Sequence, residues 1–181
     1  MTTMDTAPGE LSLPYVADLA AKLHEGQFDK GGEAYFSHVQ AVALALLPFG
    51  AYAVAAGYLH DSIEDTGITA EELAKEHAMP AEVVEAVRFV SRNLYAEGVT
   101  YMDMIRTVAT EGPYIARLVK IADNAHNSRA DRVIPSADAD FLAFSRKRYA
   151  RARKILYPSV DRNDIVTILE VINPDLLAEL G

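Results

Sequence analysis

Apolar residues recur three and four positions apart along most of the chain, which is the spacing of one buried face of an α-helix. Runs in which apolar and polar residues alternate, as in a half-buried strand, are scarce. The pattern therefore predicts an all-α fold. The expected helices, placed to within a few residues at each end, span residues 13–25, 36–47, 51–63, 69–77, 80–90, 100–110, 113–131, 139–157 and 165–172.

Local signals mark where several of these helices begin. Thr69 is followed three residues later by Glu72, the arrangement of a capping box. Pro80 and Pro113 suit a first helical turn, because proline lacks the amide hydrogen that would go unpaired there. Gly, Pro, Asp and Ser gather between the predicted helices in "DKGGE", "DTG", "AEGV" and "IPSAD", which we expect to be loops.

Length and composition fit one ordinary globular domain. The 181 residues are 50% hydrophobic and 24% charged, enough to bury a substantial core. We expect a single domain over residues 11–181 after a flexible N-terminus over residues 1–10. No uninterrupted apolar run reaches the roughly 18 residues of a membrane span, and the first residues lack the basic and apolar regions of a secretory signal. A cytoplasmic protein without a membrane partner is expected.

The charge of the chain limits its partners and its chemistry. The formal net charge is −9, and residues 1–80 hold 3 Lys and Arg against 12 Asp and Glu. Such acidity disfavours nucleic acid as a partner, because binding to its backbone depends on clustered cations. The basic run "RKRYARARK", residues 146–154, is either a solvated helix face or a surface that attracts phosphate. Since the chain has no cysteine, only His, Asp and Glu remain as strong metal ligands.

The segment "LHDSIEDTG" concentrates titratable side chains at the end of an apolar run. They are His60, Asp61, Glu64 and Asp65. If the helix continues to residue 65, all four project over neighbouring parts of one surface, since the first two stand three to five positions before the last two. Three carboxylates at the negative end of a helix dipole are unfavourable, and a divalent cation would offset that cost. The alternative is that the later acids are simply solvated and that the histidine is a hydrogen-bonded core residue.

Two further segments contribute polar residues to predicted helices. The segment "AYFSHVQAV" supplies His38, and "RLVKIADNAHNS" supplies Asp123 inside an otherwise apolar run. A lone buried carboxylate costs several kcal/mol unless it is paired or bound to a metal. Asp123 therefore needs a partner, and Lys120 and Asn127 stand three residues before it and four after it.

In their order, the segments "AAKLHEGQFDKGGEAYFSH", "LHDSIEDTG" and "VKIADNAHNSR" resemble those of the HD-domain phosphohydrolases. More narrowly, the chain resembles the hydrolase domain of Rel/SpoT-type alarmone hydrolases and their small stand-alone relatives, over roughly residues 17–132. The resemblance implies a compact helical bundle with a metal site between helices. The implied metal ligands are His38, His60, Asp61 and Asp123. Glu64 and Asp65 are implied to act on the attacking water, and Asn127 to hold the ribose or a phosphate.

The implied ligand set also suggests a metal and a substrate-binding surface. Two imidazoles and two carboxylates without sulfur suit Mn²⁺, with Fe²⁺, Co²⁺, Ni²⁺ or Zn²⁺ as alternatives. With Asn127, the substrate-binding candidates are Lys30, Tyr35, Lys120 and Arg129. His24 and His126 lie in the matching segments, and we expect them to make structural hydrogen bonds rather than to bind the metal.

The resemblance predicts a metal-dependent pyrophosphohydrolase that removes the 3′-diphosphate from guanosine 3′,5′-bis(diphosphate) or its pentaphosphate analogue. Asp29 stands where many relatives carry Arg, and this leaves a second reading open, in which the same chemistry acts on a nucleoside monophosphate or a phosphorylated dinucleotide. A third reading is a non-catalytic nucleotide-binding module. The apolar faces of residues 113–131 and of the C-terminal helix are expected to pack internally, and packing between subunits would give a homo-oligomer.

Overall fold

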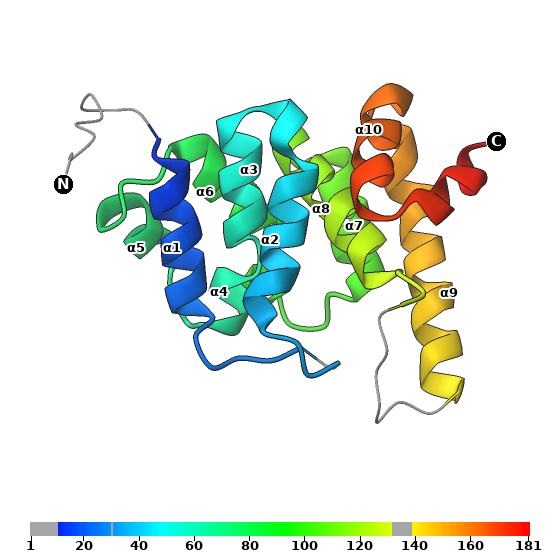
Figure 1. Ribbon diagram of the computed structural model, residues 1–181, viewed down its shortest axis with the longest axis horizontal. Helices are drawn as coiled ribbons and strands as arrows, with labels where there is room; N and C mark the ends of the chain where they lie inside the picture. The colour runs from blue at the N-terminus through cyan, green and yellow to red at the C-terminus, as the bar shows by residue number, and fades with distance from the viewer. Residues whose placement is uncertain (1–10, 30, 132–138) are drawn as a thin grey trace.

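The computed structural model describes residues 11–29, 31–131 and 139–181, and there the chain forms α-helices and no β-strand (Figure 1). The predicted all-α fold is confirmed. The α-helices are α1 (Leu13–Leu23), α2 (Tyr35–Ala45), α3 (Ala51–Leu59), α4 (Ser62–Asp65), α5 (Ala70–Lys75), α6 (Ala81–Val90), α7 (Tyr101–Thr110), α8 (Tyr114–Asn127), α9 (Ala139–Leu156) and α10 (Arg162–Ile172). Short 3₁₀ helices are η1 (Leu47–Phe49), η2 (Arg92–Leu94), η3 (Tyr157–Ser159) and η4 (Pro174–Leu180).

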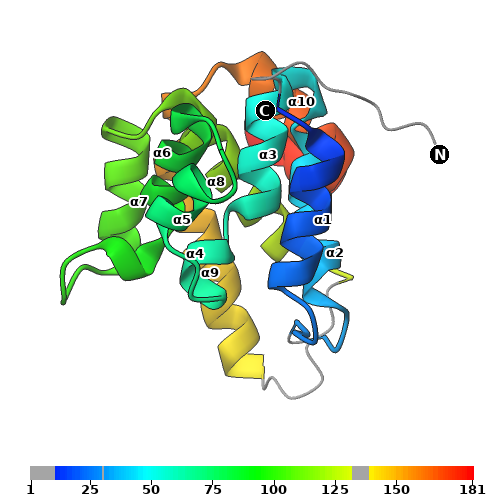
Figure 2. The same ribbon diagram turned by 90° about the vertical axis from the view of Figure 1, so that its left-hand side faces the viewer.

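Two helices, α3 and α8, lie at the centre of the bundle. Helix α8 packs against α2, α3, α6, α7, α9 and α10, and α3 also packs against α1, α2 and α6. The N-terminal part of α9, yellow in Figures 1 and 2, extends away from the other helices. The buried apolar side chains form one cluster. Among the described helices, none has both the length and the apolar content that crossing a bilayer requires.

Helices α2 and α3 approach each other closely at Gly57. A Cβ atom at this position would lie 2.8 Å from the Cα atom of Ala43 and 3.1 Å from its amide nitrogen. Real Cβ atoms do not come so near a backbone, so only glycine allows this approach. Because α2 carries His38 and α3 leads directly into His60, the approach brings these two imidazoles together.

The predicted continuous helix over residues 51–63 is wrong, because the chain breaks at His60 and Asp61. Helix α3 ends at Leu59, and the single turn α4 begins at Ser62. The Ser62 hydroxyl donates to the Leu59 carbonyl at 2.6 Å, and the His60 ring donates through Nδ1 to the Gly57 carbonyl at 2.8 Å. Side chains thus bond to carbonyls at the end of α3, which favours a break over a continued helix.

Other boundaries differ by a few residues. Helix α8 ends at Asn127 rather than at residue 131, and α10 begins at Arg162 because the Asp161 carboxylate caps it by accepting from the Asn163 amide at 2.8 Å. The capping box at Thr69 is confirmed, with its hydroxyl accepting from the Glu72 amide at 3.1 Å. The expected flexible N-terminus, residues 1–10, lies outside the described residues.

A buried arginine ties α9 and the C-terminal segment to the end of α8. Arg153 is 5% exposed, and its Nε and Nη2 atoms donate to Glu179 at 2.8 and 2.6 Å. Its Nη1 atom donates to the Asn124 side-chain oxygen at 3.0 Å and to the Ser128 hydroxyl at 2.8 Å. Asn124 directly follows Asp123, so this network braces the helix that carries Asp123.

We expect Arg153→Ala to lower the free energy of unfolding by about 2–3 kcal/mol, because it leaves buried polar partners without a charged donor. Urea denaturation followed by circular dichroism measures the change. Arg106→Ala is the matched control, since Arg106 pairs with Asp103 on the exposed surface and should cost less than about 1 kcal/mol. Equal losses in the two variants would contradict the bracing role.

Candidate metal centre and pocket

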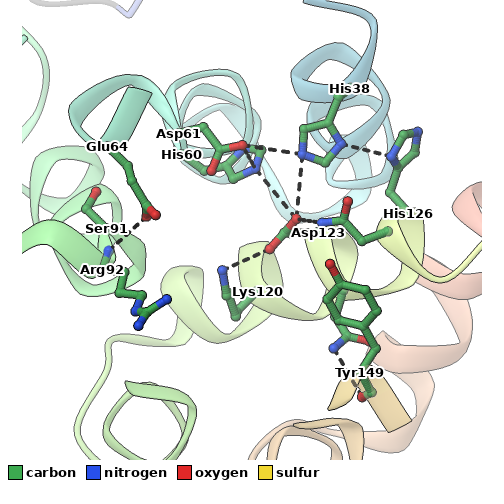
Figure 3. Close-up of polar contacts among 12 residues, drawn as sticks. His38, His60, Asp61, Glu64, Ser91, Arg92, Lys120, Asp123, His126 and Tyr149 are labelled. Carbon is green, nitrogen blue, oxygen red and sulfur yellow. Dashed lines mark hydrogen bonds and ion pairs between the residues drawn. The ribbon is translucent and has the colours of Figure 1, made fainter. Parts of the chain in front are cut away.

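Side chains from two helices and from the break after α3 meet at one point (Figure 3). They are His38 of α2, His60 and Asp61 at the break, and Asp123 of α8. The His38 Nε2 atom lies 3.4 Å from Asp61 Oδ2 and 3.5 Å from Asp123 Oδ1. The His60 Nε2 atom lies 3.1 and 3.9 Å from the same two oxygens. The fold thus brings together all four side chains that the resemblance implied as ligands.

The arrangement of donor atoms fits a divalent cation. Ligand atoms of His38, His60 and Asp61 all lie within 4.8 Å of one another, a spacing at which they could hold a metal ion. The His60 Nε2 atom is buried and has no hydrogen-bond partner. Because the same ring donates through Nδ1 to a backbone carbonyl, its Nε2 lone pair is available to a cation.

The ring and the carboxylate at the break stabilise each other's charge. Burial disfavours the charged form of His60, but the neighbouring Asp61 outweighs it and raises the pKa of His60 to about 9. Burial also opposes ionisation of Asp61, yet the His60 and His38 rings hold the pKa of that carboxyl well below its usual range. The raised pKa of His60 means that the carboxylates favour a cation at this ring, and the lowered pKa of Asp61 means that its carboxylate stays ionised. A divalent metal ion could take the place of the proton on His60.

Asp123 has the partners that its burial requires. It is 7% exposed, and Lys120, also 7% exposed, donates to its Oδ2 atom at 2.9 Å. Asn127 donates to Oδ1. Burial alone would raise the pKa of Asp123, but the Lys120 ammonium lowers it, and Asp123 in turn raises the pKa of Lys120 against the effect of burial. The predicted pairing of Asp123 is confirmed.

A pocket of about 670 Å³ opens over this centre. One wall contains Asp61, Glu64 and Asp65, and Lys120 and Asp123 of α8 also line the pocket. The opposite wall comes from residues 141–149 of α9. Its lining residues are Phe141, Leu142, Ser145, Arg146, Arg148 and Tyr149. The volume is in the range of small-molecule sites.

The two acids after the break face the pocket with altered acidity. Glu64 accepts from the backbone amide of Arg92 at 2.9 Å, and partial burial raises the pKa of its carboxyl. Partial burial, followed by the charge of Asp61, raises the pKa of Asp65. Gln27 donates to the Asp65 backbone carbonyl at 3.0 Å and so anchors the end of α4. A raised pKa suits a carboxylate that accepts a proton near neutral pH.

Of the residues predicted to bind substrate, all that the structure describes line the pocket. Tyr35 lines the pocket and donates its hydroxyl to Asp61 Oδ2 at 2.7 Å. Asn127 and Arg129 also line the pocket, and Arg129 pairs with Asp131 at 2.6 Å. Lys30 lies outside the described residues. His24 contacts Gln27 and His126 contacts His38, each at 2.8 Å, as expected of histidines that make structural hydrogen bonds.

The basic run of residues 146–154, for which a surface that attracts phosphate was one of two expectations, supplies Arg146 and Arg148 to the α9 wall of the pocket. Arg148 lies 5.0 Å from the ring centroids of Tyr101 and Tyr149 and 5.9 Å from that of Phe144. Its Nε atom is buried without a hydrogen-bond partner. The sequence held a signal for this wall, because its residues recur at the spacing of one helix face.

Comparisons with known proteins agree with this geometry. Residues 17–139 match a family described as "HD domain". A guanosine-3′,5′-bis(diphosphate) 3′-pyrophosphohydrolase of Haemophilus influenzae is 37% identical over 119 residues, which is 61% of this chain and 17% of that protein. A Mycobacterium leprae protein named "Probable GTP pyrophosphokinase" is 34% identical over 124 residues, 65% of this chain and 16% of that one. The chain therefore spans about a sixth of the length of these relatives.

A solved structure has the same fold over nearly the whole chain. It is described as a metazoan ortholog of SpoT that hydrolyzes ppGpp. The TM-score is 0.72, and the alignment covers 94% of this chain and 98% of that one. At 22% sequence identity, this likeness establishes a shared fold.

Proposed function

Because the chain belongs to the HD domain family, we propose that it is a metal-dependent pyrophosphohydrolase acting on guanosine 3′,5′-bis(diphosphate) or its pentaphosphate analogue. Water would attack the 3′-diphosphate, the bond between phosphorus and the 3′ oxygen would break, and GDP or GTP and pyrophosphate would leave. The observation that carries the proposal is the convergence of two imidazole nitrogens and two carboxylate oxygens beside a pocket. The names of aligned relatives support the same reaction.

We propose His38, His60, Asp61 and Asp123 as the ligands of one divalent cation. Mn²⁺ is the ion we favour, because the set mixes nitrogen and oxygen donors and contains no sulfur. Such an ion lowers the pKa of water and neutralises charge that develops on phosphoryl oxygens. The pocket and the buried apolar cluster support one catalytic domain over residues 11–181.

Residues around the proposed ligands have distinct parts in the reaction. Glu64 accepts the proton of the attacking water, and Asp65 assists from the next position of the same turn. The Tyr35 hydroxyl orients Asp61 by donating to it, and Lys120 holds Asp123 ionised. The raised pKa of Glu64 supports its role, since a stronger base takes a proton more readily.

The distribution of charge in the pocket supports a substrate with phosphate at both ends. Acidic residues and the proposed metal lie at one wall, where a single diphosphate would react. Arg146 and Arg148 lie on the α9 wall, where a second phosphate group would find its countercharge. Asn127 and Arg129 also line the pocket, and we propose that both contact the substrate.

We expect Arg148→Ala to raise the KM for the doubly phosphorylated substrate about 10- to 150-fold while changing kcat little, because a charge-assisted hydrogen bond contributes about 1.5–3 kcal/mol. Steady-state kinetics with Mn²⁺ measures both constants. Lys147→Ala is the control, since this neighbouring cation does not line the pocket. An unchanged KM in a stable Arg148→Ala protein would exclude Arg148 from substrate binding.

A second candidate function is hydrolysis of another nucleotide by the same chemistry. The position of Asp29 favours this alternative. This carboxylate lines the pocket and organises its loop by accepting from the amides of Gly31 at 2.8 Å and Glu33 at 3.0 Å. It places negative charge near the proposed phosphate sites. A non-catalytic module has less support, because mere binding would not need Glu64 and Asp65 at the pocket wall.

A nucleotide panel distinguishes these candidates. Purified protein is incubated with Mn²⁺ and either the tetraphosphate alarmone, its pentaphosphate analogue, nucleoside monophosphates or a phosphorylated dinucleotide, and the products are separated by ion exchange. We expect pyrophosphate from the 3′-diphosphate guanine nucleotides alone, with activity lost to a chelator and restored by Mn²⁺. Free phosphate from mononucleotides would favour the second candidate, and binding without any product would contradict a hydrolase.

A further inference from the structure

One of the two buried imidazoles at the proposed metal centre contacts another histidine. The Nδ1 atom of His38 lies 2.8 Å from the Nδ1 atom of His126. The ring centroids are 4.7 Å apart and the ring planes are inclined by 52°. His126 belongs to the last turn of α8, and Figure 3 shows it on the side of His38 that faces away from Asp61.

The partner of each ring nitrogen determines which nitrogen of His38 and of His126 carries the hydrogen. If His38 binds a metal through Nε2, that nitrogen is deprotonated, and the neutral ring carries its hydrogen on Nδ1. The short contact then requires His126 Nδ1 to accept this hydrogen. A neutral His126 ring must consequently carry its own hydrogen on Nε2.

The other ligand imidazole is held in the same way by a different group. His60 also turns Nε2 toward the carboxylates, and its Nδ1 donates to the backbone carbonyl of Gly57 at 2.8 Å. A backbone carbonyl is always an acceptor. At His38 the acceptor is the side chain of His126. A substitution can therefore remove the acceptor of His38, whereas the backbone acceptor of His60 would remain.

From these contacts we propose that His126 is a positioning residue, which accepts a hydrogen bond from His38 and holds that ring with its Nε2 lone pair directed at the metal. The proposal rests on the metal-dependent function above and adds a residue that touches neither metal nor substrate. An imidazole acceptor adds no negative charge to a centre that already contains Asp61 and Asp123. It therefore orients the ligand without weakening the positive charge that the phosphoryl oxygens would meet.

The test compares an acceptor with a nonpolar side chain of similar size. In His126→Asn, the amide oxygen attached to Cγ takes the place of Nδ1, whereas His126→Leu offers no acceptor. Isothermal titration calorimetry with Mn²⁺ on the purified whole chain gives the dissociation constant. We expect His126→Leu to weaken binding about 10- to 100-fold and His126→Asn to stay within about threefold of the unsubstituted protein. Melting curves in the presence of a chelator check that each variant folds.

His77→Leu is the matched control, because the His77 ring contacts the Tyr15 hydroxyl at 2.8 Å and His77 does not line the pocket. It should leave the dissociation constant unchanged. A second readout is the tautomer of His126 in the ¹⁵N-labelled, Zn²⁺-loaded protein, where two-bond ¹H–¹⁵N spectra should show the hydrogen on Nε2. A hydrogen on Nδ1, or equal Mn²⁺ affinity in His126→Leu, would overturn the positioning role and leave the proposed function intact. If the unsubstituted protein binds no Mn²⁺, the proposed function fails and this inference fails with it.

Discussion

Asp123→Asn should eliminate stoichiometric metal binding and lower the rate of hydrolysis at least a thousandfold. A metal ion supplies several kcal/mol of transition-state stabilisation, and each 1.36 kcal/mol corresponds to a factor of ten. The same substitution leaves the buried Lys120 ammonium without its carboxylate, which we expect to cost about 3–5 kcal/mol of stability. Calorimetric titration with Mn²⁺, kinetics and urea denaturation measure the three effects.

A double variant separates the loss of metal from the loss of stability. Lys120→Met combined with Asp123→Asn removes both charges, so stability should recover much of the deficit. Metal binding and hydrolysis should not recover, since the oxygen donor is still altered. Stoichiometric Mn²⁺ binding by the single variant would show that Asp123 is not a ligand.

Glu64→Gln should slow hydrolysis about 100-fold or more while Mn²⁺ affinity stays nearly unchanged. The carboxylate is proposed to accept the proton of the attacking water, and a positioned acid–base group contributes on this scale. The amide keeps the size of the side chain and can still accept from the Arg92 amide, as Glu64 does at 2.9 Å. Single-turnover kinetics at saturating metal isolates the chemical step.

The pH dependence gives an independent check on this residue. Partial burial raises the pKa of Glu64 above its ordinary value of 4.5. The carboxylate form exists above that pKa, so kcat/KM should fall as the pH drops through a value higher than 4.5. Glu64→Gln should lose this acidic limb. If activity survived both Glu64→Gln and Asp65→Asn, the assignment of these acids would be wrong.

Apolar periodicity was sufficient to predict most of the helices, and the order of the motifs carried the resemblance that implied the residues of the proposed centre. Apolar periodicity located α1, α2 and α6 to within a few residues. The segments around His38, His60 and Asp123 indicated residues that the fold brings together. Burial of Asp123 predicted its need for a partner, and Lys120 meets that need.

Features that depend on contacts between distant segments were not predictable from the same patterns. The break at His60 arises because the His60 and Ser62 side chains bond to carbonyls of the preceding turn, which periodicity does not reveal. The α9 wall faces the pocket only because α9 packs on α7 and α8. His126 meets His38 across 88 positions of sequence, so only the folded chain shows which nitrogen faces which.

The central claim is that four side chains bind one divalent cation, and anomalous diffraction tests it most directly. Crystals of this chain grown with Mn²⁺ would be measured on both sides of the manganese absorption edge. We predict one strong anomalous peak bounded by the Nε2 atoms of His38 and His60 and by the facing oxygens of Asp61 and Asp123. Absence of a peak there, in crystals of protein that hydrolyses the alarmone with Mn²⁺ in solution, would contradict the account.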